Sequence, residues 1–228
     1  MKTNLFISFF FTLTLSFSQS ERKVISYIDS INSLASSHYR SNDINQSFNY
    51  LLKNVELSES VNDDYGNAQA NFLLGNLYQY MGLSNEAAES YSKMLASAKS
   101  IDDNYLVASS YLSLGEVYKE FKPADEVILY YKKAIALQEK LSEDNTEDIE
   151  KSRNNLALSY KNSGNYKLAL EIYNQILDNK SMITERPGVY AVVLDNFAHT
   201  LYLSGDFTKL PGLYFQSLKI SDLNLLNI

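Results

Sequence analysis

A short pattern of residues recurs along the sequence at an almost constant interval, and this interval restricts the folds open to the chain more than any other feature. The clearest copy occupies residues 71–94. In this copy Leu74, Gly75 and Tyr78 lie within about one turn of one predicted helix, and Gly82 then interrupts the helical pattern. Counting Gly75 itself, the equivalent positions in the five copies are Ala35, Gly75, Gly115, Ala157 and Ala198. The intervals between them are 40, 40, 42 and 41 residues. A helical hairpin cannot bury its apolar face alone, so this interval predicts a solenoid of stacked hairpins.

The composition agrees with a helical chain. Hydrophobic residues make up 45% of the 228 residues, which is enough for a packed core. The sequence has only 3 Pro and 8 Gly, which argues against a loop-rich or all-β fold. The 18 Tyr recur in phase with the repeats, as Tyr78 and Tyr118 illustrate, so we assign these tyrosines to packing between helices.

Polar segments separate the predicted hairpins in constant phase. Residues 60–65 and 100–105 are 40 residues apart, and each places carboxylates where the next helix begins, a position that suits the helix dipole. The acidic stretch 143–150 takes the equivalent place in the next unit. A solvated helix start is the favoured interpretation, because this stretch lacks the Gly and the spacing of a calcium loop; a cation site is the alternative.

Proline marks three further boundaries. Pro123 stands where a second helix is expected to begin, and Pro187 with Gly188 marks the turn before the fourth clear unit. Pro211 and Gly212 fall inside the expected second helix of that unit. Because an interior proline costs about 3 kcal/mol, we expect this helix to begin late or to be kinked.

These residues carry a family resemblance. The pattern resembles the tetratricopeptide repeat over about residues 25–220. It consists of Leu-Gly-x-x-Tyr, a second Gly seven residues after the first, and then Ala, Tyr and Ala or an equivalent. The resemblance implies an all-α fold, a right-handed α-solenoid of about five helix-turn-helix repeats with a period of 40–42 residues, over residues 19–228. The usual period is about 34 residues. The extra residues fall after Met94, Ala134 and Ile176, so the second helix of each pair, or its exit turn, is expected to be longer.

The long variant resembles the extracytoplasmic sensor regions of bacterial envelope regulators, in which such repeats precede a membrane helix and a histidine kinase or DNA-binding output domain. Residues 221–228 fall in the phase of residues 100–103, so the chain is expected to stop as a sixth unit begins. Two explanations of this ending stay open. The chain is a truncated relative of a longer regulator, or a partner covers the exposed face of its last unit. Self-association through this uncapped C-terminal end is a further expectation.

The N-terminus has the pattern of an export signal. Lys2 precedes an apolar run over residues 5–17, and Ser16 and Ser18 stand at the −3 and −1 positions of a cleavage site before Gln19. Residues 1–18 are therefore predicted to be a cleavable signal peptide, and the mature chain to be periplasmic or in the cell envelope. An uncleaved anchor or a buried first helix is the alternative. The sequence has no Cys, so the signal is not that of a lipoprotein.

The sequence predicts no catalytic, cofactor or metal site. A net charge of −7 argues against nucleic acid as a partner, and the absence of Cys excludes disulfides and thiolate chemistry. The only histidines are His38, expected to be a packing residue, and His199, expected to be a surface contact. No HExxH motif, phosphate-binding loop or nucleophile elbow occurs, and no later stretch is long and apolar enough to span a membrane. An enzyme is therefore not expected.

The remaining function is the binding of a protein or peptide. The resemblance implies that the first helices line a concave surface and that contacts come from positions beside the packing residues. Carried over by phase, these positions are Phe72, Asn76, Gln79, Tyr80, Leu112, Glu116, Lys119, Glu120, Asn154, Asn155, Leu158, Lys161, Asp195, His199 and Tyr202. A clamp for a peptide carboxylate is not expected, because Phe72 stands where that clamp needs a lysine.

Overall fold

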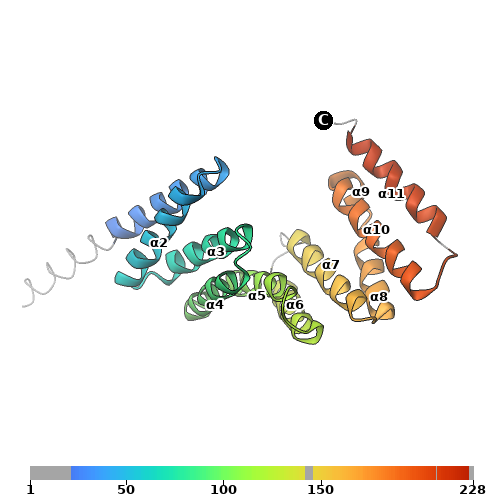
Figure 1. The fold of residues 1–228 in the computed structure, drawn as a ribbon, viewed down its shortest axis with the longest axis horizontal. Coiled ribbons are helices and arrows are strands. Elements are labelled where there is room, and N and C mark those ends of the chain that lie inside the picture. The colour runs from blue at the N-terminus through green and yellow to red at the C-terminus, as the bar shows by residue number, and fades with distance from the viewer. Residues whose placement is uncertain (1–21, 142–145, 209, 226–228) are drawn as a thin grey trace, which may run out of the picture. The chain divides into compact units, whose positions relative to one another are not determined.

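A computed structural model describes residues 22–141, 146–208 and 210–225 of the chain, and every secondary-structure element in these ranges is a helix (Figure 1). The helices are a first helix over residues 22–40, α2 (Ile44–Ser60), α3 (Asp64–Tyr80), α4 (Ser84–Ser100), α5 (Asn104–Tyr118), α6 (Ala124–Gln138), α7 (Thr146–Asn162), α8 (Tyr166–Leu177), α9 (Met182–Glu185), α10 (Pro187–Ser204) and α11 (Leu210–Leu225). The all-α prediction is confirmed. The predicted signal peptide lies outside the described residues and stays a prediction.

The chain divides into two compact units between Ser110 and Tyr111, inside α5. In unit 1, α2 packs on α3 and α3 on α4. In unit 2, α6 packs on α7, α7 on α8, α8 on α10 and α10 on α11, so helices that follow one another along the chain also lie together. Among the described residues, no helix is both long and apolar enough to cross a membrane.

Helix length explains the 40-residue period in unit 1. The helices α2, α3 and α4 each contain 17 residues, and three residues connect each helix to the next. Two such helices with their two connections make up one period. The extra length had been predicted for the second helix or its exit turn; instead, both helices of a pair are equally long. The sequence could not separate these cases because its packing signature covers only the central part of each hairpin.

Each connection in unit 1 repeats one backbone arrangement. The middle residue has a positive φ, which Gly, Asn and Asp tolerate best: Asn42 (62°), Asn62 (53°), Gly82 (74°) and Asp102 (53°). The next residue donates its N–H to a carbonyl five residues back, for example Asp63 to Ser58 at 2.8 Å. Asp63 then accepts a hydrogen bond from the N–H of Gly66 at 3.0 Å. The predicted carboxylates at helix starts are therefore confirmed, and one turn both ends a helix and begins the next.

The repeated Gly is a packing position. A Cβ atom on Gly75 would lie 2.3 Å from the ring of Tyr91, and one on Gly115 would lie 2.6 Å from the ring of Tyr131. Both tyrosines are almost wholly buried. The helices thus approach closely because the first helix has no side chain where the second helix inserts its ring.

The last pair of helices departs from the pattern where proline occurs. Pro123 precedes α6, as predicted. Pro187 and Gly188 were expected in the turn before the fourth unit but are the first two residues of α10, a position that Pro tolerates because its missing N–H would have no helical partner there. The helix α11 begins only at Leu210, which places Pro211 in its first turn, so the expected late start is correct. The helix α11 continues through Leu225, past the position equivalent to the end of α4 at Ser100. Residues 226–228 lie outside the described residues, and the prediction that the chain stops as a sixth unit begins stays a prediction.

Candidate functional site

A groove of about 700 Å³ lies in unit 1 across three successive first helices of the repeats: the helix over residues 22–40, α3 and α5. It is lined by Asp29, Asn32, Ser33, Ser36, Arg40, Tyr65, Gln69, Phe72, Leu73, Met94, Asp103, Tyr105, Leu106 and Ser109. The predicted role of the first helices as the surface that carries a groove therefore agrees with the position of this cavity.

Side-chain amides form one wall of this groove. Asn32 donates to Gln69 Oε1 at 3.0 Å and accepts from Asn54 Nδ2 at 2.6 Å. Asn54 is fully buried and also accepts from the Ser58 hydroxyl at 2.9 Å. Because these bonds hold Asn32 and Gln69 from behind, the polar wall is fixed before any ligand arrives.

Aromatic side chains and one cation face the open side of the groove. Tyr65 and Tyr105 are each 49% exposed although neither serves the core, and Phe72 is half-buried with its ring 6.5 Å from that of Tyr91. Arg40 is exposed and forms no ion pair with any residue that the structure describes. The groove thus offers amides, rings and a free guanidinium, a set suited to hydrogen bonding and stacking rather than to catalysis.

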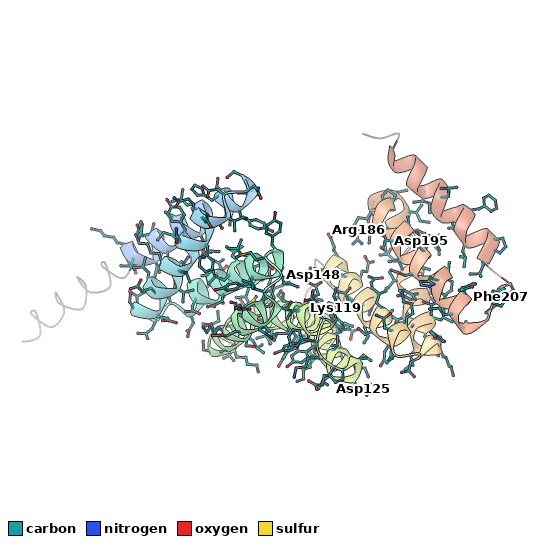
Figure 2. All side chains as sticks on the ribbon, in the orientation of Figure 1. Lys119, Asp125, Asp148, Arg186, Asp195 and Phe207 are labelled. Carbon is teal, nitrogen blue, oxygen red and sulfur yellow. The ribbon has the colours of Figure 1, made fainter. Side chains whose placement is uncertain are left out.

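A second groove, of about 540 Å³, lies in unit 2 between α7 and α10. It is lined by Glu147, Asp148, Glu150, Lys151, Asn154, Arg186, Gly188, Val189, Val192 and Val193. Figure 2 labels Asp148 and Arg186 in this part of unit 2, and the view separates them from Asp125 and Phe207 of the same unit.

Ion pairs hold the walls of the second groove. Glu150 is 5% exposed and accepts hydrogen bonds from Arg186 and, at 2.7 Å, from Asn179. Lys151 pairs with Glu116 at 3.0 Å, and Asn155 also donates to Glu116 at 3.1 Å. These contacts connect α7 to the segment before α10 and to the end of α5 inside unit 2.

The predicted contact residues divide between the grooves and their surroundings. Phe72 lines the first groove and Asn154 the second. Asn76 and Gln79 instead surround the hydroxyl of Tyr91, whose oxygen lies 2.7 Å from a side-chain oxygen of each. Tyr80 is exposed and packs its ring edge-on against Tyr39, with centroids 6.1 Å apart.

The remaining predicted residues line neither groove. Leu112 is 7% exposed and belongs to the core of unit 2, so its prediction as a surface contact is wrong: its side chain packs among Val127 and Tyr131 instead of facing solvent. Leu158 and Lys161 are half-buried, and burial lowers the pKa of Lys161. The exposed members are Lys119, Glu120, Asp195, His199 and Tyr202.

Sequence reasoning missed most of the groove residues because it used the wrong stretch of each first helix. It took positions from three residues before the repeated Gly to five after it. Tyr65 and Tyr105 each lie ten residues before that Gly, and Asp29, Gln69 and Ser109 lie six before their reference positions. In unit 2, Glu147 and Lys151 occupy these same two phases. The recurrence of Tyr at a 40-residue interval was the signal that could have found them.

His38 packs against an aromatic ring as predicted, and the predicted contact at His199 stays a prediction. The ring of His38 stacks on Tyr50 with centroids 5.4 Å apart and lies 3.2 Å from Asp43, whereas His199 is exposed. No group of three or more potential metal-ligating side chains occurs among the described residues. Residues 143–145 of the acidic stretch lie outside the described residues; from Thr146 onward it forms the start of α7, in agreement with the favoured interpretation.

Known proteins resemble the chain in fold. The structure of BtubC (BKLC) from P. vanneervenii has a TM-score of 0.79 at 18% identity, covering 88% of this chain and 82% of that one. A Podosopora anserina putative kinesin light chain with TPR-like repeats has a TM-score of 0.71 at 18% identity, covering 87% and 97%. YrrB, described as a TPR protein with an unusual peptide-binding site, has a TM-score of 0.59 at 18% identity, covering 87% and 91%. No curated protein matches the sequence.

A family model agrees with these structures. The model described as tetratricopeptide repeat matches residues 68–100 and 150–181, one segment in each unit. Each matched segment contains the reference position of its hairpin, Gly75 in the first and Ala157 in the second. The two matched segments, residues 68–100 and 150–181, therefore resemble tetratricopeptide repeats.

Proposed function

We propose that the chain is a non-enzymatic scaffold that binds a protein or an extended peptide on the first helices of its repeats. The observation that carries the proposal is the groove of unit 1, because its amide wall is fixed by buried hydrogen bonds while Tyr65 and Tyr105 present half-exposed rings. Preorganised polar groups beside exposed aromatic rings are typical of recognition surfaces. The description of YrrB as having a peptide-binding site supports the same class of ligand.

The proposal can be tested with the chain lacking residues 1–18, immobilised and exposed to an envelope extract. We expect a specific protein to be retained, and we expect Tyr65→Ala combined with Tyr105→Ala to reduce its retention about tenfold, because aromatic anchors dominate binding energy. Tyr80→Ala is the matched control, since Tyr80 is 62% exposed and lies outside the groove. Equal retention by the double variant, or no retention above empty beads, would refute the proposal.

The proposal also places the scaffold outside the cytoplasm, in the periplasm or cell envelope. This part rests on the signal pattern of residues 1–18 alone. N-terminal sequencing of the protein recovered from the producing cells tests it: a chain that starts at Gln19 supports export, and a chain that retains Met1 argues against a cleaved signal.

A second candidate is a sensory domain of a signalling regulator. It is favoured by the 40-residue period, in which α3 and α4 of one hairpin each contribute 17 residues, because repeats of this length resemble those of the sensor regions. The coding sequence downstream distinguishes the two: a membrane helix followed by a kinase or DNA-binding domain supports the sensory domain, and an unrelated reading frame favours the free scaffold.

A further inference from the structure

We propose that the groove of unit 2 receives an extended protein segment in which basic residues alternate with aliphatic ones. The inference rests on the proposed scaffold function and names the chemistry of the partner that this groove accepts. Three features carry it: the charge left over on the groove, the exposed valines, and the contrast with the groove of unit 1.

The cations of the second groove are already neutralised within the unit. Arg186 is paired with the buried Glu150, and Lys151 is paired with the half-buried Glu116. Glu147 and Asp148 line the same groove and form no ion pair with any described residue. The two carboxylates that remain give the groove a surplus of negative charge that a basic partner would neutralise.

The other side of this groove is aliphatic. Val189 and Val192 lie one turn apart on α10 and are 45% and 57% exposed, while Val193 beside them is buried. A β-branched side chain has little rotamer freedom to lose when a partner covers it. An exposed aliphatic strip beside a charged rim is the arrangement expected of an interaction site rather than of a solvated face.

The position of Glu147 and Asp148 also has a simpler explanation, which the test must distinguish from a role in binding. Glu147 and Asp148 stand in the first turn of α7, where any carboxylate stabilises the helix dipole. Asp125 and Glu126 occupy the same place in α6 of the same unit and line no part of the groove. Neutralising either pair removes the same charge and the same dipole interaction, and in α6 it also breaks the exposed Lys122–Glu126 ion pair. The α6 variant is therefore a control for loss of charge at a helix start outside the groove.

The experiment measures fluorescence anisotropy of a short labelled peptide in which lysine alternates with valine and isoleucine. We expect binding that weakens with rising salt, and a roughly tenfold weaker affinity for Glu147→Gln with Asp148→Asn. Asp125→Asn with Glu126→Gln is expected to bind as the unmodified chain does. Val192→Ser should also weaken binding, whereas Leu129→Ser should not, because Leu129 is 50% exposed on α6 outside the groove.

The results separate the inference from the scaffold function beneath it. Equal binding of a peptide with glutamate in place of lysine, or equal losses in the α6 and α7 variants, would overturn the inference. In either case a partner retained from envelope extract through Tyr65 and Tyr105 would leave the scaffold function standing. If the lysine peptide binds as expected but no protein is retained by the unit 1 groove, the unit 2 inference stands and the unit 1 assignment falls.

Discussion

The two grooves lie at the same positions of their repeats but differ in chemistry. In unit 1 the wall consists of neutral amides, Asn32 and Gln69, held by the buried Asn54, and the open side carries tyrosines. In unit 2 the wall consists of ion pairs around Glu150 and Glu116, and the open side carries valines. The helical repeat determines where a groove forms, and the residues that do not take part in the repeated packing determine what it can bind.

The largest effect is expected from breaking the buried ion pair in unit 2. Arg186→Ala would leave Glu150 buried with only Asn179 as a partner, and should lower the free energy of unfolding by about 3 kcal/mol. Arg153→Ala is the control, because Arg153 and Glu139 are paired at 2.8 Å on the surface and such pairs contribute about 0.2–1 kcal/mol. Urea unfolding monitored by circular dichroism measures both; a similar small loss for the two variants would contradict the role given to Glu150.

A smaller loss is expected when the amide wall of unit 1 is broken. Asn54→Ala removes the donor to Asn32 Oδ1 and the acceptor of Ser58, and should cost about 2 kcal/mol because buried polar groups lose their partners. Asn174 is exposed on α8, and Asn174→Ala should be neutral or slightly stabilising. Amide hydrogen exchange should locate the loss of protection to residues 22–100. Faster exchange in unit 2 alone would argue against this wall.

The close approach of helices in both units predicts a loss of similar size. Gly75→Ala would place a Cβ atom 2.3 Å from the buried ring of Tyr91 and should cost about 1–3 kcal/mol through overpacking. Gly212 has no atom within 4 Å of the corresponding position, so Gly212→Ala should be neutral or stabilising. The midpoint of urea unfolding distinguishes them. An unchanged midpoint for Gly75→Ala would show that the two helices can separate freely.

The smallest effects come from the hydroxyls of two buried tyrosines and sharpen the comparison between units. Tyr91→Phe in unit 1 leaves Asn76 and Gln79 without the hydroxyl between them and should cost about 1 kcal/mol. In unit 2 the buried Tyr173 hydroxyl lies near Thr200 but forms no hydrogen bond of good geometry with any described residue, and Thr200 donates its own hydroxyl proton to the Asn196 carbonyl at 2.7 Å. Tyr173→Phe should therefore be neutral or stabilising. A loss in Tyr173→Phe as large as that in Tyr91→Phe would contradict the difference.

The sequence predicted the repeated packing more accurately than the grooves. A small residue recurs at the position of Gly75, and aromatic residues recur in most units at the positions of Tyr78 and Tyr91, because these side chains fit against one another between the helices. Their period therefore reveals both the helices and the contact between them. Of the predicted contact residues, Phe72 and Asn154 lie beside a groove, and their role in binding stays a prediction. Leu112 does not lie beside a groove, although it has the same phase as Phe72, because the core of unit 2 covers its side chain.

The grooves could not be predicted in the same way because their residues repeat within unit 1 but not between the two units. Tyr65 and Tyr105 share a phase, but Glu147 and Gly188 occupy that phase in unit 2. A buried contact constrains residue type in every copy, whereas an exposed position does not. The phase of a groove position can be read only after the helix bounds are known, and these bounds extend beyond the packing signature.

The sequence by itself determined that the chain is a series of helical hairpins with a period of 40–42 residues, because the spacing of small and aromatic residues permits no other burial of the apolar faces. Only the tertiary structure decided how the polar residues are used. Glu150 and Arg186 are 36 residues apart, and Asn32 and Gln69 are 37 apart. Nothing in their local pattern distinguishes them from solvated side chains. Packing of successive repeats removes them from water, and a polar group that loses water must find a partner.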